Sequence, residues 1–147
     1  MITASREHTI SCGHRVVGHE SKCRYLHGHN YTVITTISCP QLDEVGRVLD
    51  FGVMKALFAE WLEMNWDHKM LLWTQDSLLS VPALRNAESD WGIVRVPFNP
   101  TAEHMARYLL DNVFPQLLAQ DNHSDIHLSR VRVVETPKCW ADATPEP

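Results

Sequence analysis

Two histidines separated by one glycine lie in the segment KCRYLHGHNY, residues 22–31. His27 and His29 open a stretch rich in β-branched residues, and side chains two positions apart on a strand point to the same face. Two imidazoles placed in this way can bind one metal ion. His14 is the best candidate for a third ligand if residues 7–17 form the partner strand. Three neutral imidazoles leave one tetrahedral position open, as in catalytic rather than structural zinc sites.

Cys23 precedes His27 by four positions and has three interpretations. It can be a fourth ligand that closes a structural zinc site, a nucleophile or base beside an open site, or a small buried apolar residue. A nearby dication, with Lys22 and Arg24 alongside, would favour the reactive thiolate form. The spacing alone does not separate the three, and among nine histidines the H-x-H pattern itself can arise by chance.

Two carboxylates could support acid–base chemistry. Asp67 precedes His68 at the end of the first predicted helix, and a carboxylate beside an imidazole can orient it and raise its basicity. Adjacent residues rarely face each other on a helix, so a solvated helix end is the alternative. Glu135 ends a predicted strand, where a carboxylate is most often solvated. It would gain a role if a ligand presented two parallel N–H donors.

Two helices are predicted from apolar periodicity. The first begins near Asp50, a plausible N-cap, and runs to residue 66. The second lies in the segment 99–118, with Thr101 as its N-cap. Its buried stripe is predicted to contain Met105, Leu109 and Val113.

The remaining segments predict strands, an irregular excursion and a tail. Strands are expected at 7–17, 30–38, 92–98 and 128–136. Residues 73–92 lack clean periodicity, and 138–147 are expected to be a flexible tail. Because helices and hairpins are segregated, we expect one α+β domain over 1–147 with an antiparallel sheet. Its open sheet edges could be satisfied by oligomerisation.

The composition narrows the class of protein. With 147 residues, 44% of them hydrophobic, the chain can bury a single core. A net charge of −5 and the lack of a basic stripe argue against nucleic acid binding. No apolar run is long enough to cross a membrane, and no secretory signal is recognised, so we expect a cytoplasmic protein. Its four cysteines, without a C-x-x-C pair, are expected to be free thiols.

Taken together, these segments resemble the 6-pyruvoyl-tetrahydropterin synthase family, and most closely its queuosine-type branch of 6-carboxytetrahydropterin synthases. The resemblance covers nearly the whole chain and rests on six segments in the same order: CGHRV, KCRYLHGHNY, VLDFGVMK, DHKML, NPTAEHMA and VVET. Three residues between Cys23 and His27 are typical of the bacterial queuosine-type enzymes. The segment 73–97 is longer than in compact bacterial members, and its role is not assigned.

The resemblance implies a function. It is the zinc-dependent conversion of 7,8-dihydroneopterin triphosphate to 6-carboxytetrahydropterin, with release of acetaldehyde and triphosphate. The residue roles that it implies are Zn²⁺ ligands (His14, His27, His29), a catalytic base (Cys23), a proton relay from a neighbouring subunit (Asp67, His68), a pterin anchor that could also belong to the relay (Glu135), a substrate contact (Thr101) and, by proximity only, triphosphate cations (Arg15, Lys22, Arg24, Lys69).

The implied architecture is the tunnelling fold, a four-stranded antiparallel sheet with two helices on one face. Family members form trimers around a shared barrel and pair these as hexamers. Two other functions stay open. The chain could catalyse a different pterin side-chain reaction, such as the 6-pyruvoyl-forming one, or it could be a non-catalytic domain that zinc stabilises.

Overall fold

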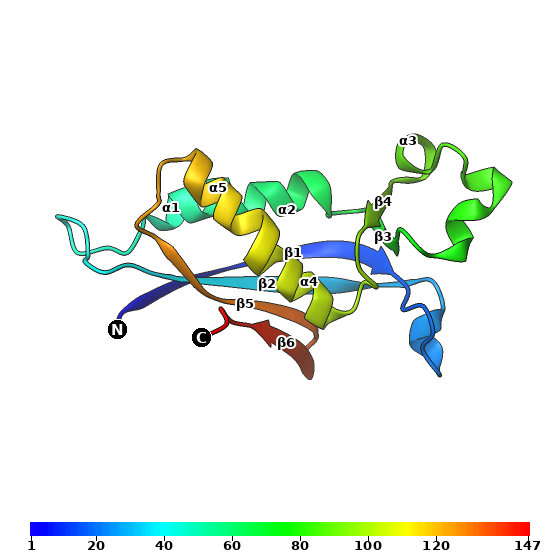
Figure 1. The fold of residues 1–147 in the computed structure, drawn as a ribbon, viewed down its shortest axis with the longest axis horizontal. Coiled ribbons are helices and arrows are strands. Elements are labelled where there is room, and N and C mark those ends of the chain that lie inside the picture. Colours follow the sequence, from blue (N-terminus) through cyan, green and yellow to red (C-terminus); the bar gives the residue numbers. More distant parts are fainter.

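Two long antiparallel strands form the centre of the molecule. The computed structural model describes all 147 residues. Strands β1 (Thr3–His14) and β2 (His27–Ser38) pair over their whole length, from Thr3 opposite Ser38 to His14 opposite His27 (Figure 1). The predicted pairing of the strand before His14 with the strand after His27 is thus confirmed, and it brings the two histidines to the same end of the sheet.

The sheet is larger than predicted and mixed in direction. Its six strands lie in the order β4-β3-β1-β2-β5-β6. The outer strands are β3 (Met70–Trp73), β4 (Ile93–Val96), β5 (His127–Thr136) and β6 (Cys139–Ala143). Strand β3 runs parallel to β1 and to β4, whereas β1, β2, β5 and β6 are antiparallel. The prediction of a four-stranded, wholly antiparallel sheet is therefore wrong.

Two strands, β3 and β6, were not predicted. The strand MLLW is too short to show alternation, so apolar periodicity does not predict β3. The predicted flexible tail at 138–147 contains β6, which pairs with β5 from Thr136 opposite Cys139 to Val131 opposite Ala143. Hydrogen bonding to a neighbouring strand orders a segment that has little apolar pattern of its own.

The first helical segment runs from 51 to 65 as three joined pieces. These are α1 (Phe51–Met54), the wider turn η2 (Lys55–Ala59) and α2 (Glu60–Asn65). Asp50 caps it as predicted, because its side chain accepts a hydrogen bond of 2.8 Å from the Gly52 backbone N–H. Met54, Phe58 and Leu62 form the buried stripe.

The second helical segment, 102–120, crosses the same face of the sheet. It consists of α4 (Ala102–Tyr108), η5 (Leu109–Val113) and α5 (Phe114–Gln120). The Thr101 hydroxyl caps it by accepting from the His104 backbone N–H at 3.2 Å. Met105, Leu109 and Val113 are all buried, which confirms the predicted stripe.

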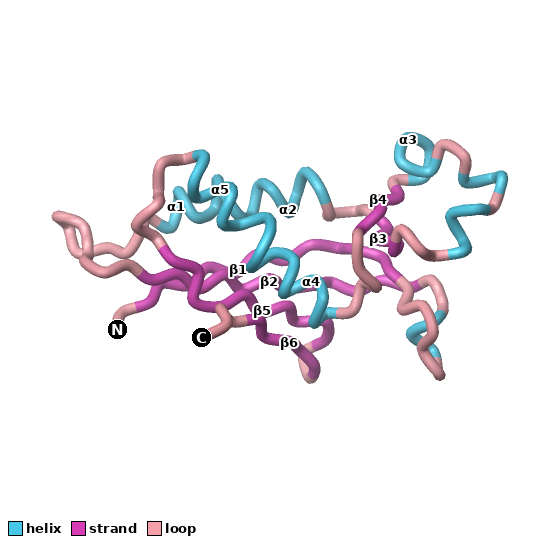
Figure 2. Tube along the Cα trace, viewed as in Figure 1, coloured by secondary structure: helices cyan, strands magenta, loops and turns pink.

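The core fills the space between these helices and the sheet. Alternate residues of β2, among them Tyr31, Val33 and Ile37, face the helices, and Val131 and Val133 of β5 do the same. Figure 2 shows both helical segments on this one face. The histidines therefore lie on the same face of β2 as the core residues, at the beginning of the strand.

The predicted irregular excursion connects β3 to β4. It contains the short turns η3 (Ser77–Ser80) and η4 (Pro82–Leu84) and the helix α3 (Ala87–Trp91). Parallel neighbours require a crossover of this kind. Asp76 at its start is buried and binds the Arg15 guanidinium through both carboxylate oxygens. The excursion is thus fastened to the residue that follows His14.

Candidate active site and metal centre

Three histidine rings converge where β1 ends and β2 begins. His14, His27 and His29 each offer one ring nitrogen, and these atoms all lie within 4.8 Å of one another. The Nε2 atoms of His14 and His27 are 3.1 Å apart. His14 lies opposite His27 in the strand register, and His29 points to the same face two residues on. The structure therefore brings together the three residues predicted as ligands.

Their hydrogen bonds turn these nitrogens toward a common point. His14 donates its Nδ1–H to the Pro100 carbonyl and His27 donates its Nδ1–H to the Tyr25 carbonyl, each at 2.6 Å. Because a carbonyl only accepts, both neutral rings carry their lone pair on Nε2. Two such lone pairs at 3.1 Å repel each other unless a cation lies between them.

Burial favours the form of the rings that binds metals. Desolvation lowers the pKa of His14, and the neighbouring rings lower it further, against the opposing effects of the Pro100 hydrogen bond and of Glu135. Desolvation also lowers the pKa of His29. The His29 Nε2 atom is buried and has no hydrogen-bond partner. These residues fit a divalent cation, because an unpaired buried nitrogen and neutral imidazoles are what such an ion requires.

Glu135 lies beside this histidine cluster rather than in solvent. One of its oxygens, Oε1, is 3.5 Å from the His14 Nε2 and 3.6 Å from the His29 Nε2. The same oxygen accepts a hydrogen bond of 3.4 Å from the Tyr31 hydroxyl. The site therefore contains a carboxylate whose position depends on the register between β2 and β5.

Tyr31 is a site residue that sequence reasoning missed. Its side chain is fully buried, and its ring packs edge-on against His14 and His29, with centroids 5.7 and 5.4 Å apart. The signal was present in the sequence: Tyr31 continues the i, i+2 row that begins with His27 and His29. A tyrosine in such a row is most often a core residue, so the spacing alone does not indicate a site residue.

A cavity of about 250 Å³ adjoins the cluster and collects the other predicted groups. Its wall includes Cys23, Thr101 and Glu135, together with Glu103 and Trp140. Cys23 belongs to the turn η1 (Lys22–Arg24) and is partly exposed. It is not a member of the histidine group that could hold a metal. The structure thus places a thiol, a hydroxyl and a carboxylate around one small space.

Asp67 and His68 contact each other directly, in contrast to the expectation for neighbours on a helix. His68 has a φ of 57°, in the left-handed region, which turns its ring back toward Asp67. The His68 Nδ1 is 2.7 Å from the Asp67 Oδ2, and the Ser11 backbone N–H donates to the Asp67 Oδ1 at 2.9 Å. Burial raises the pKa of Asp67, but these hydrogen bonds outweigh it and hold the pKa below its ordinary value.

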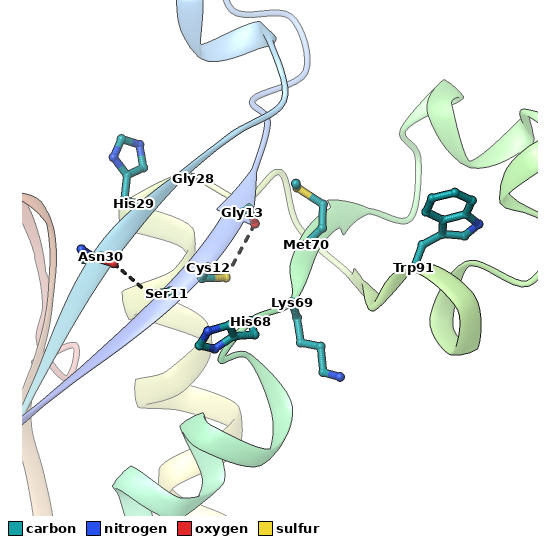
Figure 3. Close-up of a pocket in the computed structure, with 10 residues that line it drawn as sticks. All are labelled: Ser11, Cys12, Gly13, Gly28, His29, Asn30, His68, Lys69, Met70 and Trp91. Carbon is teal, nitrogen blue, oxygen red and sulfur yellow. Dashed lines mark hydrogen bonds between the residues drawn. The ribbon is translucent and has the colours of Figure 1, made fainter.

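His68 belongs to a different cavity from Cys23 and Glu135. This second cavity, of about 500 Å³, is lined by His68, Lys69 and Trp91, and by parts of β1 and β2 (Figure 3). The His68 side chain is 81% exposed. Within one chain, His68 and the Cys23 thiol therefore line separate cavities.

The four predicted triphosphate cations have other positions. None of them lines the cavity that contains Cys23. The Arg15 guanidinium is engaged by Asp76, and Arg24 donates to the Glu20 carbonyl and to the Tyr25 hydroxyl. Lys69 lines the second cavity. The residues that would bind a triphosphate within this chain are therefore not identified by proximity in sequence.

The model of the family described as 6-pyruvoyl tetrahydropterin synthase matches residues 3–146. The chain belongs to this family. A 6-carboxy-5,6,7,8-tetrahydropterin synthase of Rickettsia bellii is 35% identical over 144 residues, which cover 97% of this chain and 99% of that protein. A probable enzyme of the same name from Halobacterium salinarum is 35% identical over 135 residues, covering 90% of this chain and 79% of the relative.

Solved structures of pterin synthases share the fold. The 6-pyruvoyl tetrahydropterin synthase of Plasmodium falciparum superimposes with a TM-score of 0.75 at 20% identity, covering 99% of this chain and 98% of that one. An uncharacterised Wolinella succinogenes protein gives 0.81 at 23% identity, with the same coverage. The chain therefore has the α+β fold of this family and is an enzyme of its type. None of its helices has the length and apolar character required to span a membrane.

Proposed function

We propose that the protein is a zinc-dependent lyase that converts 7,8-dihydroneopterin triphosphate to 6-carboxytetrahydropterin, releasing acetaldehyde and triphosphate, in queuosine and 7-deazapurine biosynthesis. The observation that carries the proposal is the convergence of three histidines beside a cavity lined by Cys23 and Glu135. The full-length relatives named 6-carboxy-5,6,7,8-tetrahydropterin synthase support this reaction over others of the family.

The metal would be held by His14, His27 and His29. Burial lowers the pKa of His14 and of His29, and the carbonyl acceptors on Nδ1 of His14 and His27 leave the lone pair of each ring on Nε2, so these nitrogens suit Zn²⁺. A Zn²⁺ ion held there would supply Lewis-acid chemistry, which increases the acidity of the side-chain protons of the substrate and stabilises developing negative charge. The protein supplies the geometry, because the register of β1 and β2 brings the three rings together.

Cys23 is the proposed base. The proton to be removed is on a carbinol carbon of the substrate side chain, which is a very weak acid. The base must therefore lie close to that carbon, and it must not be a ligand of the metal. Cys23 meets the second condition by its absence from the histidine group, and it shares a cavity with the anchor residue Glu135. A substrate held by Glu135 in this cavity would therefore lie beside the Cys23 thiol.

Glu135 and Thr101 are proposed to bind the pterin. A carboxylate accepts two parallel N–H bonds from the amino-pyrimidine edge of the ring. The Thr101 oxygen already accepts the His104 N–H, so its own hydroxyl proton is free to be donated to a ligand. Both residues line the cavity of Cys23, and a ring held there would present its tail to the thiol.

The Asp67–His68 pair is proposed to relay the proton in the active site of a neighbouring subunit. Its cavity is separate from that of Cys23 in the same chain, which supports a site completed between subunits. The proposed assembly is a hexamer made of two trimers. Each trimer would close the edge strands β4 and β6 into a barrel.

Product analysis tests the function directly. Purified, zinc-loaded protein is incubated with 7,8-dihydroneopterin triphosphate, and the products are identified by mass. The proposal predicts 6-carboxytetrahydropterin and acetaldehyde. A 6-pyruvoyl product would show the other side-chain reaction of the family. An unchanged substrate, together with metal-dependent melting of the protein, would indicate a non-catalytic zinc-stabilised domain.

A further inference from the structure

Tyr31 combines full burial with a polar contact to the site. It lies on β2 two residues after His29, on the same face. Its ring packs at a steep angle against the rings of both His14 and His29, with centroids 5.7 and 5.4 Å apart. A buried phenol normally has a hydrogen-bond partner, and here the partner is the Glu135 carboxylate.

The direction of this hydrogen bond follows from the chemistry of the pair. An ionised carboxylate has no hydrogen to give, so the Tyr31 hydroxyl donates to the Glu135 Oε1. No other hydrogen bond to the Glu135 side chain forms within the chain, although its side chain is only 26% exposed. Its second oxygen, Oε2, thus has no partner in the protein.

We propose that Tyr31 is a positioning residue that fixes the Glu135 carboxylate for a ligand with paired N–H donors. The Tyr31 hydroxyl holds Oε1 beside the histidine cluster. This leaves Oε2, and a second lone pair of Oε1, for the ligand. The inference rests on the proposed function in one respect: the ligand is taken to be a pterin.

The surroundings of Glu135 explain why such a residue is needed. Oε1 lies only 3.5 and 3.6 Å from the Nε2 atoms of His14 and His29. A carboxylate without the Tyr31 contact could rotate toward a cation held by these rings and lose its orientation toward the cavity. Two-point recognition depends on that orientation, because both oxygens must lie in the plane of the two donors.

A double-mutant cycle tests the proposal. Four zinc-loaded proteins are compared: wild type, Tyr31→Phe, Glu135→Ala and the double variant. Phenylalanine keeps the ring packing and removes only the hydroxyl. The dissociation constant of neopterin is measured by fluorescence, and zinc content by metal analysis. Tyr31→Phe is expected to weaken neopterin binding about tenfold in the wild-type background, with full zinc content.

The decisive comparison is in the Glu135→Ala background. There, Tyr31→Phe is expected to have no further effect on neopterin binding, because the group that it positions is gone. Tyr108→Phe is the matched control. Tyr108, on α4, packs against Phe98 and Trp66, and its hydroxyl forms no hydrogen bond within the chain. The Tyr108→Phe variant should therefore bind neopterin as the wild type does.

Three results would overturn the proposal: unchanged neopterin binding in Tyr31→Phe, an equal loss with and without Glu135, or loss of zinc from Tyr31→Phe. If wild-type protein does not bind neopterin at all, the proposed function fails separately. The contact is then judged by the denaturation midpoints of the four proteins. Non-additive changes support the Tyr31–Glu135 coupling, and additive changes overturn it.

Discussion

Cys23 and the histidines have different environments although they are neighbours in sequence. His27 has its Nδ1 bonded to a carbonyl and its Nε2 turned toward His14, whereas Cys23 lies in a turn at the wall of the adjacent cavity. The difference arises because β2 begins at His27, after Cys23, so only the histidines share the strand's alternation. Their roles can therefore be separated by substitution.

Replacing Cys23 by alanine should abolish turnover and leave zinc in place. Loss of a general base is expected to slow turnover by roughly a hundredfold to ten thousandfold. The measurements are the steady-state rate and the zinc content of the purified variant. Cys39→Ala, a change at a partly buried thiol at the far end of β2, is the control and should behave as wild type. Zinc lost together with Cys23 would make it a ligand.

Replacing His27 by alanine should have the opposite signature. One of three nitrogen ligands is lost, so zinc affinity should fall by at least about a hundredfold and turnover should disappear with it. Competition with a chelator measures the affinity. His123→Ala is a suitable control, because His123 contacts Asp121 on the surface away from the cluster. Full zinc occupancy in His27→Ala would refute the assignment.

At the scale of elements, the strongest sequence signals were the helix caps and the long strands. Asp50 and Thr101 cap the helices as predicted. An N-cap side chain accepts a hydrogen bond from a backbone N–H two or three residues later, so this contact depends on local sequence alone. The pairing of His14 with His27 was also predicted, on the condition that residues 7–17 form the partner strand. The His68 contact to Asp67 was not, since it depends on a left-handed backbone at a non-glycine residue.

Other elements depend on partners distant in sequence. Strand β6 is ordered by β5 and by packing against α4, and β3 by a two-residue parallel contact with β1. Glu135 reaches the histidine cluster only because β5 adds to β2 in one register. No local sequence pattern specifies such pairings. The sequence therefore indicated that Glu135 lies at a strand end, but not that it lies beside the histidines.

The excursion between β3 and β4 depends on the Arg15–Asp76 ion pair. Asp76→Asn should destabilise the protein by about 2 to 3 kcal/mol, because it leaves the Arg15 guanidinium without its carboxylate partner and weakens the cap on the Leu78 N–H. Urea unfolding at neutral pH measures the loss. Asp43→Asn, which breaks an exposed pair with Arg47, should cost much less.

This ion pair also predicts a pH dependence. Burial raises the pKa of Asp76, but the hydrogen bonds from Arg15 and from the Leu78 N–H outweigh it and lower the pKa. The folded-state pKa is then below the unfolded value of about 3.9, so the stabilisation is present above that pH and is lost as pH falls through the folded-state value. The difference in stability between wild type and Asp76→Asn should shrink accordingly in acid. A constant difference would contradict this account.

At the scale of the whole molecule, one chain carries two incomplete halves of the proposed site. Cys23 and Glu135 line one cavity and His68 lines another. Its sheet also ends in two strands, β4 and β6, that pair on one side only. Assembly through these edges would bring the halves from different subunits together, as the proposed hexamer requires.

Complementation between inactive variants tests this arrangement. Cys23→Ala and His68→Ala are each expected to be inactive. When they are mixed, unfolded and refolded together in equal amounts, about a quarter of the sites should combine an intact half from each chain and regain activity. The same variants refolded separately and then assayed together are the control. No recovery in the co-refolded mixture would place the whole site within one chain.

The proposed mechanism requires three nitrogen ligands to the metal and a Cys23 sulfur that does not coordinate it. X-ray absorption at the zinc edge of the purified protein measures this coordination directly. We predict a first shell of nitrogen and oxygen atoms at about 2.0 to 2.1 Å, with three imidazoles and no sulfur. A zinc–sulfur distance of about 2.3 Å would contradict the account, because Cys23 could then not serve as the free base.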